Sequence, residues 1–280
     1  MTTIRVTLLA ENTAYGPGLL AEHGLAYWIE IDSRRVLFDT GQGGVLLHNA
    51  FRLSVPLREV DAVVLSHGHY DHTGGLADAL KTTRPVPVYA HPAALEPKFM
   101  VDSGHKSRDI GIPFPSKRAV REHAERLVET REPTSVAPGL FVTGYVPRVT
   151  DFETTGGDFF LDSDGHRPDP VEDDQSVFFD SVAGTVVLLG CAHAGVVNTL
   201  HHIRRLTNER PIHAVFGGMH LVGASQERVR RTIGELRELG IGRLGPAHCT
   251  GIAAIAALWN ALPGQCISCH AGARFEFQSD

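Results

Sequence analysis

The sequence predicts an α/β protein folded as a four-layer αββα sandwich, in which two packed sheets carry helices on both outer faces. Short apolar runs rich in β-branched residues alternate with segments of helical spacing through both halves of the chain. Histidine or aspartate follows a predicted strand at five separate places. Because strand ends of α/β layers carry binding sites, this pattern also predicts a functional site at one edge of the two sheets.

Composition narrows the class of protein. The formal charge of −6 leaves no basic surface for broad nucleic-acid binding. No apolar stretch approaches the length needed to span a bilayer, so we expect no membrane association and a cytoplasmic location. Four cysteines are too few for a disulfide scaffold. Cys266 and Cys269 have CxxC spacing without a second such pair, which favours a structural role and leaves a redox or extra metal role open.

The first half of the chain is predicted to form one sheet with its helices. Alternation and β-branched residues predict strands at Ile4–Leu9, Gly24–Ile31, Arg35–Asp39, Val60–Leu65 and Val86–Ala90. Asp32-Ser33-Arg34 is the turn of a hairpin between the second and third of these. Helices are predicted at Val45–Leu53 and Leu76–Lys81.

The middle of the chain, about residues 92–174, is rich in proline, glycine and charge and is predicted to be irregular, apart from a strand at Gly139–Gly144. It is too long for a plain connection. We therefore expect a single domain over residues 1–280 with an insertion here, near the mouth of the active site. His91, just before it, either lines the pocket or is a packed loop histidine.

The second half repeats the strand and helix pattern. A hairpin joins Ser176–Val182 to Thr185–Leu189 through Ala183-Gly184. The segments that follow are a helix at Val196–Leu206, a strand at Ile212–Phe216, a helix at Gln226–Leu239, a short strand from Gly242, a helix at Ile252–Leu262 and a strand at Ala273–Phe277.

The most specific motif is Ser66-His67-Gly68-His69-Tyr70-Asp71-His72-Thr73-Gly74-Gly75, directly after a buried strand. His67 and His69 are two apart, so in extended chain their side chains leave on the same side. Asp71 and His72 follow where the chain turns and can face a second position nearby. Imidazole with carboxylate suits zinc, iron or manganese. Two ligand pairs on one loop predict two metals, roughly 3.5–4 Å apart in metal-assisted hydrolysis.

Two more histidines stand at strand ends before helices. His193 is a candidate third ligand for the metal held by His67 and His69, and His248 for the metal held by Asp71 and His72. Packed core histidines are the alternative at both positions.

The spacing His67-x-His69-x-Asp71-His72 after an apolar strand resembles the metallo-β-lactamase superfamily. Further segments resemble its branch of 7,8-dihydropterin-6-methyl-4-(β-D-ribofuranosyl)aminobenzene-5′-phosphate-synthase-like proteins: Glu22 to Ala26, Val146 to Glu153, Asp173 to Gln175, Gly190 to Leu200, Gly217 to Leu221 and His248 to Gly251. The resemblance implies that Asp39 lies beneath the metal loop and accepts hydrogen bonds from it.

One segment departs from the superfamily pattern. After Ile212–Phe216 the superfamily usually supplies an aspartate that bridges two metals, but here Gly217-Gly218-Met219-His220 stands instead. His220 is therefore open to three roles: a ligand, a contact to substrate, or a proton donor to the leaving group. Without the bridging carboxylate, the second metal site is expected to be weak.

The function we expect is hydrolysis of a small, phosphate-bearing substrate by a metal-activated hydroxide, with two divalent ions, zinc before manganese or iron. Asp71 would bind metal and orient the water, and His220 would act on the leaving group. Arg148, Lys106 and Arg108 are candidates to bind the phosphate. The alternatives are iron-dependent chemistry like that of persulfide dioxygenases and a non-catalytic metal-binding protein. The sequence leaves a homodimer open.

Overall fold

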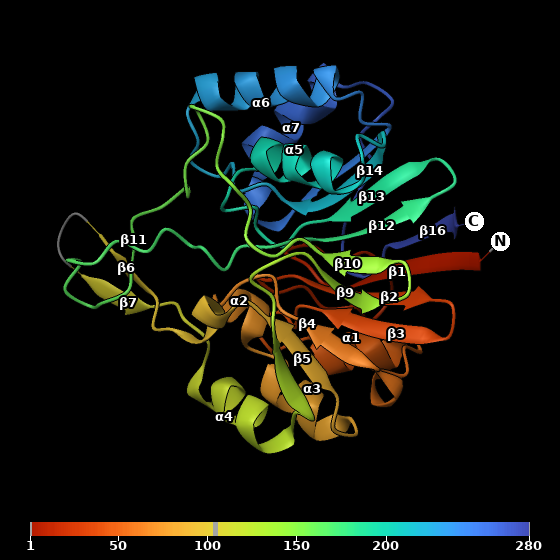
Figure 1. Ribbon diagram of the computed structural model, residues 1–280, viewed down its shortest axis with the longest axis vertical. Helices are drawn as coiled ribbons and strands as arrows, with labels where there is room; N and C mark the ends of the chain where they lie inside the picture. Colours follow the sequence, from red (N-terminus) through yellow and green to blue (C-terminus); the bar gives the residue numbers. More distant parts are fainter. Residues whose placement is uncertain (1, 103–105, 280) are drawn as a thin grey trace.

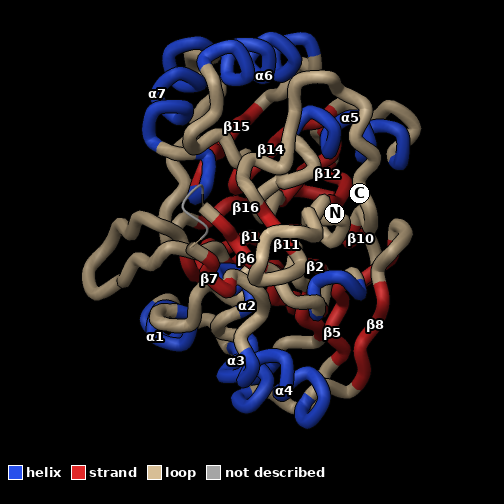
Figure 2. The backbone as a smooth tube through the Cα atoms, turned by 90° about the vertical axis from the view of Figure 1, so that its left-hand side faces the viewer, coloured by secondary structure: helices blue, strands red, loops and turns tan. Residues whose placement is uncertain are grey.

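Two β-sheets pack face to face and carry helices on their outer faces in the computed structural model, which describes residues 2–102 and 106–279. Figures 1 and 2 show the resulting four layers, with one group of helices at each end of the view and both sheets between them. This arrangement confirms the predicted αββα sandwich.

The first sheet has seven strands in the order β16-β1-β2-β3-β4-β5-β8. β1 to β3 and β16 are antiparallel neighbours, whereas β3, β4, β5 and β8 run parallel. The strands are β1 (Thr2–Ala10), β2 (Ala26–Ile31), β3 (Arg34–Phe38), β4 (Ala62–Val64), β5 (Pro87–Ala90), β8 (Arg126–Glu129) and β16 (Arg274–Ser279). The last strand, β16, pairs with the first, β1, with Phe277 opposite Ile4, so segments from the two ends of the sequence are neighbours in this sheet.

The second sheet has six strands in the order β15-β14-β13-β12-β10-β9. They are β9 (Thr134–Ala137), β10 (Leu140–Val142), β12 (Val177–Ser181), β13 (Gly184–Leu188), β14 (Ile212–Gly218) and β15 (Arg243–Ala247). β12 and β13 form the predicted hairpin, and β13, β14 and β15 are parallel. Parallel strands deliver their carboxyl ends to one edge, which is where the predicted site residues follow them.

Helices cover the outer face of each sheet (Figure 1). The first sheet carries α1 (Leu46–Arg52), α3 (Leu76–Thr82) and α4 (Phe114–His123), and the second carries α5 (Val196–Leu206), α6 (Gln226–Glu238) and α7 (Ile252–Ala261). Short turns complete the chain: α2 (Tyr70–Thr73), η1 (Leu57–Glu59), η2 (Pro92–Leu95) and η3 (His248–Thr250). A core of buried residues including Phe38, Phe179 and Phe216 lies between the sheets, and each helical layer has its own core.

The expectation that residues 92–174 are irregular is wrong for much of that segment. α4 and β8 extend the first sheet and its helical layer, and β9 extends the second sheet beside β10, which is the strand predicted at Gly139–Gly144. A separate three-stranded sheet, β6 (Phe99–Val101), β7 (Ser107–Asp109) and β11 (Phe159–Phe160), projects from one side of the sandwich (Figure 1). The sequence pattern did not predict α4, because only three of its ten residues are buried. These residues, Ser116, Ala119 and Val120, form a narrow stripe of small side chains, which gives a weak helical period.

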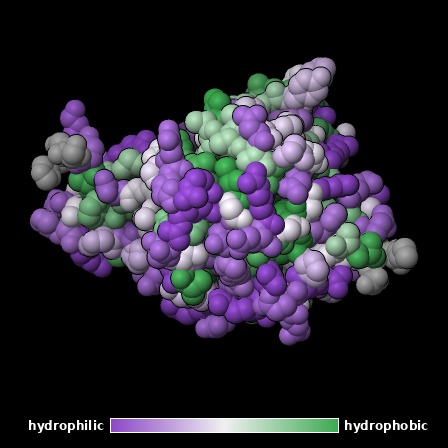
Figure 3. All heavy atoms as spheres, turned by 90° about the horizontal axis from the view of Figure 1, so that it is seen from above, coloured by the Kyte–Doolittle hydropathy of each residue, from purple (hydrophilic) through white to green (hydrophobic). Residues whose placement is uncertain are grey.

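Among the described residues, no helix is both long enough and apolar enough to cross a membrane. Figure 3, which looks down on the helical layer of the second sheet, shows apolar side chains gathered among hydrophilic ones. A cavity between α6 and α7 is lined by apolar residues, among them Leu221, Val222, Ile233 and Ala257.

Candidate metal centre

The first ligand loop begins where β4 ends. His69, with φ −71° and ψ 147°, is still extended, and α2 begins at the next residue. His67 and His69 therefore lie on extended chain and Asp71 and His72 on the first helical turn, as the spacing predicts. Position 68 must be glycine, because a Cβ there would come within 2.3 Å of the Ala94 carbonyl oxygen.

The first group of ligand atoms comes from both halves of the chain. His67 Nε2 lies 3.0 Å from His69 Nδ1. The His193 ring centroid is 4.8 Å from that of His67 and 4.9 Å from that of His69. All three side chains are buried, and their candidate ligand atoms lie within 4.8 Å of one another. We call this set the first triad.

A second triad lies beside the first. His248 Nε2 is 3.2 Å from His72 Nε2 and 3.3 Å from Asp71 Oδ2, and the last two atoms are 3.9 Å apart. The rings of His67 and His72 are 4.4 Å apart between centroids, so the two triads are adjacent. The structure thus brings together all six residues that the sequence analysis proposed as ligands.

Hydrogen bonds at Nδ1 orient four of the imidazoles, and in His67 the partner is Ser66 Oγ at 2.8 Å. His72 Nδ1 lies 2.7 Å from Asp39 Oδ2, and His193 Nδ1 lies 2.9 Å from the Thr155 carbonyl oxygen. His248 Nδ1 lies 2.8 Å from Asn12 Oδ1. A ring that donates from Nδ1 presents the Nε2 lone pair, the arrangement usual for metal-binding histidine. His193 Nε2 is buried with no hydrogen-bond partner in the described chain. This orphaned atom, facing other ligand atoms, fits a metal ion.

Burial sets the protonation of the first triad. It lowers the pKa of His69 to about 3 and those of His67 and His193 well below their usual range, and the neighbouring imidazoles lower the last two further. These rings are therefore neutral at pH 7 with lone pairs available.

The second triad carries more negative charge. Burial opposes ionisation of Asp71, but neighbouring His72 and hydrogen bonds from His23 and His248 outweigh it and lower the Asp71 pKa well below its usual range. Burial likewise disfavours His72 as a cation, yet the charges of Asp39 and Asp71 raise its pKa to about 9. The carboxylates of Asp39 and Asp71 thus favour a positive charge at His72. A divalent ion bound there would supply that charge after His72 has lost its proton.

Asp39 links the first sheet to the ligand loop. It follows β3 with φ +59° and is fully buried. Its Oδ1 accepts a hydrogen bond from the Ser66 amide at 2.7 Å, and its Oδ2 accepts one from His72 Nδ1. This is the position beneath the loop that the sequence resemblance implied.

A small pocket of about 90 Å³ opens over the two triads. His220 forms part of its wall, with its ring centroid 4.2 Å from that of His193. Arg108, from β7, also lines it and lies over the Tyr70 ring at 5.9 Å. Phe159, from β11, completes this side, and its ring lies 5.1 Å from that of His69 between centroids, tilted by 51°. The three-stranded sheet therefore supplies part of the pocket wall.

Two of the three candidate phosphate-binding residues do not line this pocket. Arg148 Nη2 donates to the Pro170 carbonyl at 2.6 Å, and Lys106 is exposed next to residues outside the described range. His91 is also away from it: its Nδ1 accepts a hydrogen bond from the Ala93 amide and caps η2, as a packed loop histidine does.

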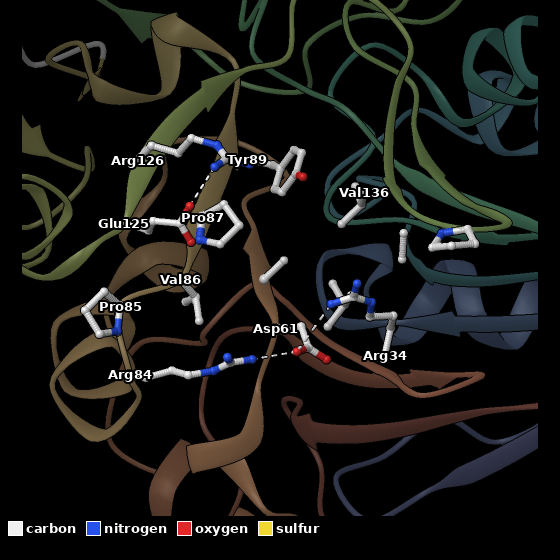
Figure 4. A pocket seen from close by; sticks show the side chains of 14 residues that line it. Arg34, Asp61, Arg84, Pro85, Val86, Pro87, Tyr89, Glu125, Arg126 and Val136 are labelled. Atoms are coloured by element: carbon white, nitrogen blue, oxygen red, sulfur yellow. Dashed lines mark hydrogen bonds and ion pairs between the residues drawn. The ribbon is translucent and has the colours of Figure 1, made fainter.

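Another cavity, of about 320 Å³, lies at the opposite end of the strands of the first sheet, and Figure 4 shows the side chains that line it. It surrounds the amino ends of β3, β4, β5 and β8 rather than their carboxyl ends. Asp61 lies 2.7 Å from Arg84 and 3.7 Å from Arg34, so the charges in this cavity are paired with one another. No candidate metal-binding group of the described residues includes a residue from its lining.

The match to a family decides the wider relationship. The model of the Metallo-beta-lactamase superfamily matches residues 20–248 of this chain. The chain belongs to this superfamily. The resemblance noted in the sequence is thereby confirmed, and the αββα sandwich is the fold expected of a member.

Individual relatives agree with this assignment. The chain is 32% identical over 268 residues to the 7,8-dihydropterin-6-methyl-4-(β-D-ribofuranosyl)-aminobenzene-5′-phosphate synthase of Methanocaldococcus jannaschii, a match that covers 90% of this chain and 89% of that protein. It is 33% identical over 255 residues to the uncharacterized protein MJ0448 of the same organism, covering 90% and 93%. The crystal structure of Tm1679, a metal-dependent hydrolase of the beta-lactamase superfamily, superposes with a TM-score of 0.83 at 30% identity, covering 99% of this chain and 100% of that one.

Sequence reasoning missed the residues that hold the two ligand loops. Asp173 Oδ2 accepts a hydrogen bond from the Gly68 amide at 2.7 Å, and Asp174 Oδ2 accepts one from the Ala194 amide at 2.8 Å. Lys98, fully buried, donates to Asp173 and Asp169, each at 2.8 Å. The two adjacent aspartates before β12 can be noticed in the sequence. Their hydrogen-bond partners lie on other loops, so no local sequence pattern predicts them.

Two further residues lie at the candidate metal centre, although the sequence did not predict a role for either of them there. His23 Nε2 lies 3.1 Å from Asp71 Oδ2 at the pocket wall. Cys191 is buried with its Sγ 3.1 Å from His72 Nε2. Cys266 and Cys269 are free and buried, each packed in a hydrophobic core, which agrees with the structural role favoured above.

Proposed function

We propose that this protein is a metal-dependent hydrolase with two divalent ions that acts on a small, phosphate-bearing substrate. The observation that carries the proposal is the convergence of the two triads, whose imidazole nitrogen and carboxylate oxygen atoms face one another beneath an open pocket. The similarity to Tm1679, a metal-dependent hydrolase, over nearly the whole chain supports the same class of chemistry.

The residues would divide between the ions by triad. His67, His69 and His193 would hold one ion, and Asp71, His72 and His248 the other. Neutral imidazoles with one carboxylate favour zinc, with manganese or iron as alternatives. Bound there, the ions would supply Lewis acidity that generates a hydroxide nucleophile from water at neutral pH and polarises an ester oxygen.

Side chains at the pocket wall would orient the attacking water and protonate the leaving group. His23 Nε2 lies 3.1 Å from Asp71 Oδ2 and can donate a hydrogen bond that holds the carboxylate in one orientation toward an attacking water. His220 lies on the pocket wall beside His193, where it can donate a proton to the leaving-group oxygen. Phe159 covers one side of the pocket and limits access of bulk water.

Arg108 is the candidate that supports a phosphate-bearing substrate. Its guanidinium lies at the pocket wall and can match two phosphate oxygens at once. A pocket of about 90 Å³ accepts the reacting group and leaves the rest of the substrate at the rim. The name of the M. jannaschii relative, a synthase whose product carries a 5′-phosphate, agrees with this substrate class.

The test combines metal analysis with turnover. Natively purified protein is analysed for metal and screened against phosphomonoesters, phosphodiesters and thioesters. We expect phosphoester hydrolysis that is removed by chelation and restored by zinc or manganese. His193→Asn should lose both metal and activity, whereas His213→Asn, at the far end of β14, should keep both.

Two results would reject this proposal. A single iron with oxygen-dependent turnover would establish the oxidative alternative. Bound metal without turnover of any substrate class would favour a non-catalytic metal-binding protein.

A further inference from the structure

We propose that the Cys191 thiolate is a ligand shared by the two metal ions and takes the place of the bridging aspartate that this chain lacks. The inference rests on the ligand assignment in the proposed function. It adds a seventh protein ligand at the point where the two triads meet.

The need for a shared ligand comes from the end of β14 and the two residues that follow it. Gly217-Gly218-Met219-His220 stands where the superfamily pattern has an aspartate between the metals. Asp71 is the only carboxylate in the candidate metal-binding groups of the described residues, and it belongs to the second triad. A negative ligand that reaches both ions must therefore come from another residue type.

The Cys191 sulfur lies among ligand atoms of both triads. It is within 4.8 Å of the ligand atoms of His67 and His193 from the first triad, and of those of His72 and His248 from the second. Its separation from His72 Nε2 is 3.1 Å. Zinc bonds of about 2.3 Å to sulfur and 2.0–2.1 Å to nitrogen place such ligands about 3.6 Å apart at a tetrahedral angle. On the second-triad side the 3.1 Å separation from His72 Nε2 is close to that value, and on the first-triad side the ligand atoms of His67 and His193 lie within 4.8 Å of the sulfur.

The backbone around Cys191 is held against the first ligand loop. A Cβ at Gly190 would come within 2.3 Å of Ser66 Oγ, so only glycine allows this approach. The Gly190 carbonyl accepts a hydrogen bond from the Gly218 amide at 3.0 Å. Cys191 itself is 3% exposed. Because His193 Nε2 beside it has no hydrogen-bond partner, the cluster as a whole points to a ligand rather than to a packed core.

Cys249 is the competing sulfur. Its thiol is 3.6 Å from the Cys191 carbonyl oxygen, to which it donates. Among the candidate metal-binding groups of the described residues, Cys249 is grouped with Cys191 and His248 but with no residue of the first triad. Cys249 therefore supports the loop that carries Cys191 and is not placed to join both ions.

Two consequences follow from a shared thiolate. Binding of the ions releases the Cys191 proton to solvent, because metal-bound thiols are deprotonated. A soft sulfur ligand also favours zinc or iron over manganese. The second site, expected from sequence to be weak without a carboxylate bridge, should then be filled in stoichiometric amounts.

The experiment reads the metal–sulfur bond directly. Metal-free protein is loaded with Co²⁺, and the near-ultraviolet thiolate-to-cobalt charge-transfer absorption is recorded together with metal stoichiometry. Wild type should bind two ions and show the band. Cys191→Ser should lose the band, while Cys249→Ser and the matched core variant Cys269→Ser should keep it. Zinc X-ray absorption of the wild type should show a sulfur neighbour at about 2.3 Å.

The possible outcomes separate this inference from the proposed function. Two bound ions with only nitrogen and oxygen neighbours, or a band that survives in Cys191→Ser, would overturn the shared thiolate and leave the hydrolase proposal standing. A band lost in Cys249→Ser but kept in Cys191→Ser would do the same. Wild-type protein that binds no metal would refute both. Should Cys191→Ser fail to fold, a sulfur neighbour retained in Cys249→Ser and Cys269→Ser still supports Cys191.

Discussion

Replacing Asp39 by asparagine tests how the fold prepares the second triad. The change removes one charge and keeps the shape of the side chain. Asparagine also tolerates the left-handed backbone at this position, where φ is +59°. The carboxylate now accepts two hydrogen bonds, from the Ser66 amide and from His72 Nδ1, both at 2.7 Å. An amide has one oxygen, so one of the two donors must lose its acceptor.

The expected magnitude follows from that loss. If the amide nitrogen faces His72, the ring must accept at Nδ1 and carry its proton on Nε2, the atom that faces His248. Loss of such an outer hydrogen bond typically lowers metal affinity 10- to 100-fold, or about 1.4–2.8 kcal/mol. Since the tautomer also changes, we expect the upper end, about 100-fold, at the second triad. The first triad should be nearly unaffected, because Asp39 makes no hydrogen bond to its members.

The assay is a zinc competition titration against a chromophoric chelator, which resolves the two binding steps. Asp61→Asn is the matched control, since Asp61 precedes β4 at the opposite edge of the same sheet and contacts Arg84. A folded Asp39→Asn protein with two zinc affinities equal to those of the wild type would refute the reasoning.

Three further predictions concern stability, each measured by urea unfolding of metal-free protein. Lys98→Met should lower the free energy of unfolding by about 3–5 kcal/mol, because it leaves two buried carboxylates without their cation; an unchanged value would contradict the ion-pair role. For His69, the pKa is about 3 when folded and 6.5 when exposed, so the unfolded chain binds the extra proton between these values. Stability should therefore fall as pH drops below 6.5, and wild type should lose about 1.4 kcal/mol per pH unit more than His69→Gln; equal slopes would refute this. Gly68→Ala should destabilise by about 1–3 kcal/mol through its clash with Ala94, whereas Gly234→Ala, in α6 with open space around it, should stabilise by about 0.5–1 kcal/mol; similar effects of the two would contradict the steric argument.

Local spacing was enough to predict the sandwich and the six candidate ligands. His67 to His72 follow a buried strand and enter a helix within six residues, so their relative directions depend only on nearby backbone. His193 and His248 also follow strands of the second sheet. Since parallel strands end at a common edge, their convergence with the first cluster followed from the fold class.

The partners of those ligands depend on packing between distant segments, which only the tertiary structure decided. His248 is oriented by Asn12, 236 residues away, and Gly68 is held by Asp173, 105 residues away. Cys191 reaches both triads, and Arg148 falls outside the pocket, because of how the two sheets and the loops of residues 92–174 fold over one another. Periodicity along the chain encodes which side of a strand or helix a residue faces, but it carries no information about which loops meet when two sheets are pressed together. That is why the six candidate ligands could be predicted from the sequence and their supporting hydrogen bonds could not.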